Sequence, residues 1–239
     1  MLKHQERPTA SQLSFVTTLL NSWYCCGAAN GEILINALKY HPFLCHCFEQ
    51  PIQDFEDQTL EMHTLKVISN FLTRFGGKQS FFERDKDFLL LLALHDIGKP
   101  AAFAAGDRNL QGLKSLEIID QMKTIFPVSS AILEKIKIMI SGDIIGCYLN
   151  PFYAESLERT VAKYRKTCLN LRTDHSLFWQ TLVIYYQCDA FAYLNLRKKM
   201  FVFRADGQAE WDATRTRLLF KPELEKMFLK LESACLKAI

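Results

Sequence analysis

A histidine and an aspartate stand side by side at the end of an apolar run, in the stretch LLALHDIGKP at residues 91–100. A buried core does not accommodate two adjacent ionisable groups, such as His95 and Asp96, unless something compensates them. Two more residues of ligand type, His63 and Asp189, lie in stretches that are otherwise apolar or aromatic. Two imidazoles and two carboxylates make a mixed nitrogen and oxygen set. Such a set suits one divalent transition metal ion, such as Mn, Fe, Co, Ni or Zn, better than Mg or Ca.

The elements that carry these four residues must bring them together. Neighbouring residues on an α-helix diverge by about 100°, so His95 and Asp96 can hold one ion only where the backbone departs from helical geometry. Gly98 and Pro100 follow directly. Both residue types commonly end helices, and they predict an unwound helix end just after the His-Asp pair.

Apolar residues recur at three- and four-residue spacing almost throughout the chain, which is typical of helices. Ten glycines and seven prolines are few for 239 residues, and this scarcity favours long helices over many short strands. Thr9 or Ser11 could cap the first helix, Ser129 or Ser130 the sixth, and Asp174 the eighth. The sequence predicts an all-α helical bundle with helices over 11–24, 31–48 (with a break at Pro42), 57–75, 83–96, 113–126, 130–140, 151–171, 175–199 and 221–239. An Asp-Gly pair also allows one small β-hairpin near 200–213.

Composition excludes several classes of protein. A hydrophobic content of 49% allows one sizeable core, so we expect a single domain over 1–239. The net charge of +3 argues against binding to duplex nucleic acid or to an anionic membrane. The longest apolar stretch, 88–94, is too short to span a bilayer. The N-terminal residues lack an apolar signal core, so we expect a cytoplasmic protein, or one delivered by a secretion route that the sequence does not reveal.

Eight cysteines do not form the paired C-x-x-C pattern of a zinc ribbon. The stretch HPFLCHCF at 41–48 also has irregular spacing for a structural zinc site. The sequence therefore predicts free cysteines in a reducing compartment.

The order of the four ligand-type residues carries a resemblance. His63, then His95-Asp96 thirty-two residues later, then Asp189 on a late helix, resembles the HD-domain superfamily of metal-dependent phosphohydrolases. An H…HD…D ligand set on a helical bundle defines that superfamily, and HDIGKP is close to the form of its signature in many members. The resemblance covers roughly residues 60 to 195, and it divides the chain into a core at about 55–197 with helical flanks at 1–54 and 198–239.

The resemblance implies that His63, His95, Asp96 and Asp189 hold one metal ion, which would activate a water and neutralise charge on phosphoryl oxygens. Asp96 would also orient the attacking water, so it is expected to be catalytic. Lys99 matches a lysine often found at this place in the family. It is expected to act in catalysis and to contact a substrate phosphate.

Members of the superfamily with two metal ions use further histidines between the HD pair and the last aspartate. This chain has no histidine between residues 96 and 174, and Gln111 stands where one would be expected. The departure favours a single metal ion.

Three more residues are candidates for binding substrate, beside Lys99. Asp143 follows Gly142 and could contact substrate or transfer a proton, although it could equally be an ordinary loop aspartate. Arg74 shares a helical stripe with His63 and could bind a phosphate with two hydrogen bonds, or simply be solvated. Tyr186 could stack on a base or hold Asp189 by its hydroxyl, or belong to the core.

These residues together predict an enzyme. We expect a metal-dependent phosphohydrolase that cleaves a small-molecule phosphomonoester or phosphodiester, most simply a nucleotide, with a metal-activated water. The sequence is also compatible with binding of a protein partner. One alternative is a phosphodiesterase acting on a phosphoribosyl-type protein modification, which would need a catalytic histidine pair. The other is a non-catalytic regulatory or binding module that keeps the fold. Loss of one of the four metal-ligand residues would indicate such a module, and all four are present.

Overall fold

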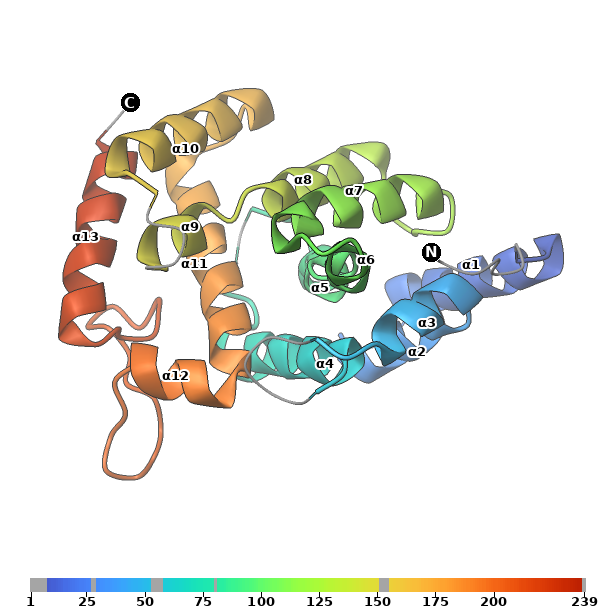
Figure 1. Ribbon diagram of the computed structural model, residues 1–239, viewed down its shortest axis with the longest axis horizontal. Coiled ribbons are helices and arrows are strands. Elements are labelled where there is room, and N and C mark those ends of the chain that lie inside the picture. Colours follow the sequence, from blue (N-terminus) through green and yellow to red (C-terminus); the bar gives the residue numbers. More distant parts are fainter. Residues whose placement is uncertain (1–7, 27–28, 53–57, 80, 151–154, 238–239) are drawn as a thin grey trace.

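The chain folds almost entirely into helices in a computed structural model, which describes residues 8–26, 29–52, 58–79, 81–150 and 155–237 (Figure 1). The prediction of an all-α protein is confirmed. The helices are α1 (Ala10–Cys25), α2 (Gly31–Lys39), α3 (Pro42–Glu49), α4 (Leu60–Asn70), the π-helical turn η1 (Phe71–Phe75), α5 (Asp85–Leu94), α6 (Lys99–Ala104), the 3-10 turn η2 (Arg108–Leu110), α7 (Gln111–Met122), α8 (Ser130–Ser141), α9 (Ile144–Leu149), α10 (Leu157–Leu171), α11 (His175–Ala192), α12 (Leu194–Met200) and α13 (Pro222–Leu236).

Helix α5 is enclosed by its neighbours. It contains the most apolar run of the sequence, and every side chain from Phe88 to Leu94 is buried. A helix that is apolar on all sides must be covered by other elements to be stable in water. Helices α2, α4 and α8 pack against α5. Figure 1 shows α5 end-on, between α4 and the α7–α8 pair.

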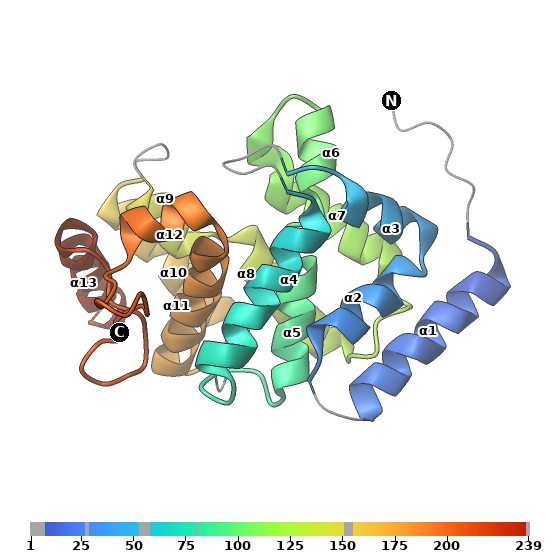
Figure 2. The ribbon, with the colours of Figure 1, turned by 90° about the horizontal axis from the view of Figure 1, so that it is seen from below.

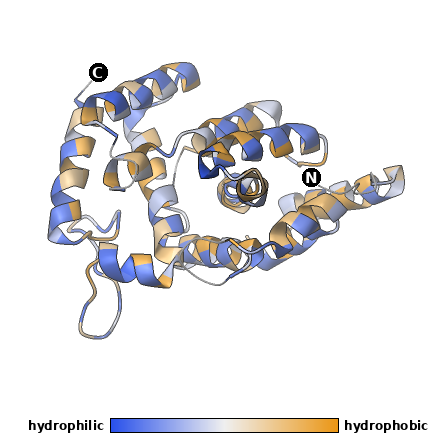
Figure 3. Cartoon of the chain, viewed as in Figure 1, coloured by the Kyte–Doolittle hydropathy of each residue, from blue (hydrophilic) through white to orange (hydrophobic). Residues whose placement is uncertain are grey.

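Helix α11 organises the second half of the fold in the same way. Its apolar residues also lie on all sides, and α4, α9, α12 and α13 pack against it. Figure 2 shows α4 and α11 next to each other where the two halves meet. Buried side chains from Val16 in α1 to Cys235 in α13 form one continuous hydrophobic cluster. Helix α12, by contrast, is mostly hydrophilic (Figure 3).

Side-chain caps fix the starts of several helices. Thr9 caps α1, Ser129 caps α8 and Asp174 caps α11, each by accepting a backbone N–H of the first turn. Such caps satisfy donors that have no partner within the helix. The alternatives that the sequence left open for the first and sixth helices are therefore settled for Thr9 and Ser129.

Two of the predicted helices differ most from the observed ones. The helix predicted over 151–171 begins only at Leu157, behind a Ser156 cap, and residues 151–154 lie outside the described residues. The helix predicted over 175–199 is broken at Tyr193, whose backbone is extended (φ −87°, ψ 118°). This break separates α11 from α12 and turns the chain.

The segment after α12 contains the predicted turn, but its pairing is more extensive than one hairpin. Asp206 and Gly207 form the turn, Gly207 has a φ of 79°, and Phe203 pairs with Ala209 in an isolated antiparallel bridge. Two more single bridges join Trp211 to Leu218 and Phe201 to Phe220. Among the described residues, β pairing is limited to such isolated bridges. None of the described helices has the length and apolar character needed to cross a membrane.

Candidate metal centre

Four side chains from three helical segments converge beside α4. His63 belongs to α4, His95 and Asp96 follow the end of α5, and Asp189 belongs to α11. One ligand atom of each lies within 4.8 Å of those of the other three. Nε2 of His63 is 2.9 Å from Oδ1 of Asp189 and 3.4 Å from Oδ2 of Asp96. Nε2 of His95 is 3.4 Å from the same Asp96 oxygen and 3.5 Å from the same Asp189 oxygen.

The ring of His95 is oriented by the backbone. Its Nδ1 lies 2.7 Å from the carbonyl oxygen of Leu92, so we assign the proton to Nδ1. Nε2 then presents a lone pair, and this buried atom has no hydrogen-bond partner among the described residues. Metal-binding histidines usually donate their other ring N–H in this manner, which fixes the ring and its tautomer.

The α-helical hydrogen bonding stops at the His-Asp pair, where the sequence predicts the helix end, although His95 itself keeps helical dihedral angles (φ −58°, ψ −38°). Helix α5 ends at Leu94, and a turn covers residues 95–98 before α6 begins. Gly98 donates its N–H to Oγ of Ser115 in α7, and that hydroxyl donates to the carbonyl of His95. A Cβ on Gly98 would lie 2.1 Å from the backbone nitrogen of Ser115. The turn therefore depends on glycine for its close approach to α7.

Both oxygens of Asp96 are held by neighbours. Nζ of Lys99 donates to Oδ2 over 2.8 Å, and the amide of Gln111 donates to Oδ1. Burial alone would raise the pKa of Asp96, but His95 and Lys99 outweigh it and lower that pKa. Asp96 is therefore an ionised carboxylate with a fixed orientation.

Lys99 is buried and lies within the site. Besides Asp96, its Nζ donates to the hydroxyl of Tyr193 over 2.9 Å. The ring of Tyr193 lies 4.5 Å from that of His63, centroid to centroid. The extended backbone at Tyr193 thus places this side chain between two members of the site. Contact of Lys99 with a substrate stays a prediction, since the two contacts described here serve to position Asp96.

The donor set fits a divalent transition metal. Ligands about 2.1 Å from one ion stand roughly 3.0 Å apart at right angles and roughly 3.4 Å apart at the tetrahedral angle. The four imidazole–carboxylate separations, from 2.9 to 3.5 Å, lie close to these values, and all donor pairs lie within 4.8 Å. Two carboxylates would offset the charge of the ion, and the lone pair of His95 would gain a partner. His63, His95, Asp96 and Asp189 can therefore hold a metal ion, whose identity the donors do not fix.

Asp143 lies near this centre, at the start of α9. Its Oδ1 accepts the backbone N–H of Gly146 over 2.8 Å. Asp143 is exposed at the edge of the centre. The protein atoms packed around its carboxyl still displace enough water to raise the pKa of Asp143 to about 6. The charges of Asp189 and Asp96 also raise it, while Lys163 opposes them. A role for Asp143 in contacting substrate or transferring a proton stays a prediction.

Two tyrosines on α11 flank the ligands. The ring of Tyr185 packs edge-on against His95, with centroids 6.0 Å apart. Tyr186 packs near Phe220 at 6.3 Å. Burial, followed by nearby carboxylates, raises the pKa of both hydroxyls well above the usual value, so both are neutral donors. A role for Tyr186 in binding substrate stays a prediction.

Arg74 does not converge with the metal ligands. It lies in η1, and its guanidinium packs over the ring of Phe191. Phe191 is two residues after Asp189 on α11, so the two side chains diverge by roughly 200° around that helix. Arg74 therefore packs against a different face of α11 from the one that carries Asp189.

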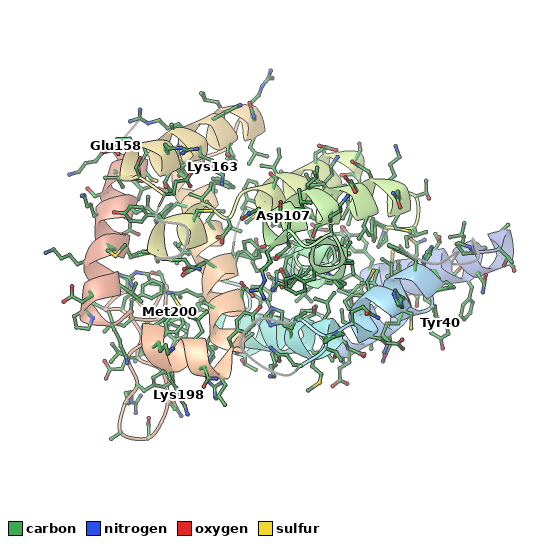
Figure 4. All side chains as sticks on the ribbon, in the orientation of Figure 1. Tyr40, Asp107, Glu158, Lys163, Lys198 and Met200 are labelled. Carbon is green, nitrogen blue, oxygen red and sulfur yellow. The ribbon has the colours of Figure 1, made fainter. Side chains whose placement is uncertain are left out.

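Sequence reasoning did not find three supporting contacts. The bonds of Gln111 to Asp96 and of Ser115 to Gly98 come from α7, which is not adjacent in sequence to the ligands. Lys163, labelled in Figure 4, lies on α10, and its charge acts on Asp143. The sequence marked Gln111 only as the place of a missing histidine, and it gave no signal for Ser115 or Lys163, because packing of helices distant in sequence brings them to the site.

Known proteins give no further guide to the centre. No protein-family model, curated protein or solved structure matches this chain.

Proposed function

We propose that this protein is a metal-dependent phosphohydrolase of the HD type, with one divalent transition metal ion held by His63, His95, Asp96 and Asp189. The observation that carries the proposal is the convergence of these four donors from separate segments within 4.8 Å. Two carboxylates held together beside two enclosed imidazoles repel each other, and a cation between them would offset this cost. The resemblance of the HDIGKP stretch to the superfamily signature gives the reaction class.

When bound, the ion would supply a Lewis acid that lowers the pKa of water and neutralises phosphoryl charge. The chain's own residues would do the rest. Lys99 and Gln111 would hold the carboxylate of Asp96, whose Oδ2 lies 3.4 Å from Nε2 of both imidazoles, in position to orient a water for attack. Asp143, whose pKa is raised to about 6, carries a proton in mildly acidic solution and could give it to a leaving oxygen.

The opening of the site bears on the substrate. Asp189 is the most accessible ligand, with 34% of its side chain exposed, whereas His63 and His95 are enclosed. A phosphoester would therefore approach from the side of Asp189, near Asp143 and the two tyrosines of α11. We propose a nucleotide or nucleotide-derived phosphomonoester or phosphodiester, because an aromatic wall can stack on a base.

The proposal is tested by metal analysis joined to a substrate screen. The full-length protein is purified, its metal content is measured by mass spectrometry, and a panel of phosphomonoesters and phosphodiesters is assayed with Mn, Fe, Co, Ni and Zn. His95→Ala and Asp96→Ala are assayed on any substrate found, with circular dichroism as the check on folding. We expect about one metal per chain and a loss of at least a hundredfold in rate for both variants.

Two outcomes would contradict the proposal. Folded His95→Ala and Asp96→Ala proteins that hydrolyse the substrate as fast as the wild type would place the chemistry elsewhere. A protein that binds metal but cleaves no phosphoester would instead be a non-catalytic binding module on this fold.

A further inference from the structure

Two arginines from different helices lie against one aromatic ring. Cζ of Arg74, in η1, is 4.5 Å from the ring centroid of Phe191, and Cζ of Arg197, in α12, is 5.4 Å from it. Phe191 is itself buried, and Phe203 stacks on it with centroids 6.0 Å apart. The arrangement depends on the break at Tyr193, which carries α12 back beside α11.

Neither guanidinium has a counter-ion among the described residues. Ion pairs there engage Arg159, Arg204 and Arg217, but not the two arginines on Phe191. Nε of Arg74 is buried and has no hydrogen-bond partner. Two aspartates of the adjoining segment are already engaged: Asp206 pairs with Arg204, and Asp212 caps its own turn. The fold thus brings two positive charges together and leaves one of their donors unsatisfied.

This arrangement costs free energy as it stands. A contact with an aromatic face stabilises one guanidinium, but a second cation on the same ring is repelled by the first. Burial and the neighbouring charge of Arg197 lower the pKa of Arg74, because both disfavour its positive charge. An arginine cannot relieve it by losing its proton under ordinary conditions. A bound anion would relieve it.

We propose that Arg74 and Arg197 form an anion site that binds a phosphate group, separate from the metal centre. Two guanidiniums carry a charge of about +2, which matches the −1.5 to −2 of a phosphate monoester better than the −1 of a carboxylate. Each planar fork can also donate two parallel hydrogen bonds to phosphate oxygens. The unsatisfied Nε of Arg74 is one such donor.

The site is distinct from the metal centre by its place on α11. Asp189 faces the metal ligands, and Phe191 faces about 200° away around the same helix. Arg74 is also three turns of helix beyond His63, and the intervening Asn70 donates to the carbonyl of Cys188. The anion site therefore does not depend on the proposed hydrolysis, and it would bind phosphate whether or not the metal centre is active.

The test measures how inorganic phosphate changes thermal stability at constant ionic strength. Phosphate is titrated into the full-length protein against sodium chloride, and the unfolding midpoint is followed. We expect phosphate to raise the midpoint of the wild type, since a ligand that binds only the folded state stabilises it. Arg197→Gln should lose this rise, with at least about a tenfold weaker apparent affinity. Lys198→Gln, a neighbour on α12 (Figure 4), should keep it.

Further variants separate binding from packing and from the metal centre. If the arginines only pack on Phe191, Arg197→Gln lowers the midpoint equally with and without phosphate, and the proposal is overturned. His95→Ala should keep the phosphate response, whereas its loss would place phosphate at the metal centre and also overturn the proposal. Should Arg74→Gln fail to fold, the half-buried Arg197 still carries the test. A parallel titration with adenosine monophosphate distinguishes free phosphate from a nucleotide as the source of the phosphate group. The natural ligand class is the one that gives the larger rise in unfolding midpoint that Arg197→Gln removes.

Discussion

Nε2 of His63 and Oδ1 of Asp189 lie 2.9 Å apart although 126 residues separate them in the chain. The contact joins α4, which packs on the enclosed helix α5, to α11, the central helix of the second half. The turn that follows α5 lies beside both helices at this contact, and it contributes His95 and Asp96. A ligand from each of three segments therefore meets only when the whole fold is assembled.

Replacing Asp189 with asparagine should weaken metal binding strongly while the fold persists. The amide keeps the shape of the side chain but removes a negative charge and one anionic donor from the centre. We expect the affinity for Mn or Zn to fall by about a hundredfold or more, measured by competition with a chromophoric chelator.

Asp174→Asn is the matched control for this variant. It makes the same substitution on the same helix, where Asp174 caps α11, and asparagine caps helices about as well as aspartate. Its metal affinity should equal that of the wild type. Equal affinity in the Asp189→Asn protein would show that the ion, if one binds, is held elsewhere.

The helical periodicity predicted the elements that carry the four ligands because each lies within a long apolar stripe. It could not predict the break at Tyr193, since no glycine, proline or capping residue marks it. That break is imposed by tertiary packing, which buries Tyr193 against His63 and Lys99. The resulting change of direction is what brings Arg197 to Phe191.

The candidate site was predicted at its ligands but not in its surroundings. His95, Asp96 and Gly98 are adjacent in sequence, so their motif was visible as one local pattern. Ser115 and Gln111 contact this motif from α7. The sequence alone does not show which residues of a distant helix will pack against the motif. Arg74 shows another limit, because it lies in the π-helical turn η1, so the α-helical spacing that relates it to His63 in the sequence does not hold there.

The contact from Gln111 to Asp96 should tune the metal centre. Gln111→Met keeps the length of the side chain but removes the amide that holds Oδ1 of Asp96. A carboxylate freed on one side can rotate, and the loss of such an outer contact typically weakens metal binding by about 10- to 100-fold. The measurement is the dissociation constant for Mn or Zn by chelator competition. Gln121→Met, on the exposed side of the same helix, should leave it unchanged.

Asp143 should make the stability of the metal-free protein depend on pH. Its pKa in the folded protein, about 6, lies above the ordinary 3.8, so folding takes up a proton between these values. The stability that protonated Asp143 contributes is complete below about pH 4 and is lost as pH rises through 6. Asparagine cannot ionise and can still accept the N–H of Gly146. Asp143→Asn should therefore gain stability relative to the wild type as pH rises.

The expected gain above pH 6 is about 1 kcal/mol, less than the full shift implies, because solvent reaches Asp143 and screens its charge. Urea unfolding in the presence of a chelator at pH 4, 5, 6 and 7 gives the free energy of unfolding for both proteins. A difference between them that stays constant over this range would show that Asp143 titrates as an ordinary carboxyl.

Gly98 should tolerate no side chain, because the His-Asp turn passes too close to α7. A Cβ at this position would lie 2.1 Å from the nitrogen of Ser115 and 2.7 Å from the carbonyl oxygen of Gln111, and backbone atoms cannot move aside cheaply. Gly98→Ala should therefore push the turn away from α7 and destabilise the protein by more than about 3 kcal/mol. Gly112→Ala is the control within α7, where the nearest atom is 3.6 Å away and alanine should stabilise the helix by about 0.5 to 1 kcal/mol. Thermal unfolding of both variants, with metal content measured on the folded fraction, compares the two directly. A Gly98→Ala protein as stable as the wild type, with its metal retained, would mean that the turn does not need this close approach to hold His95 and Asp96 in place.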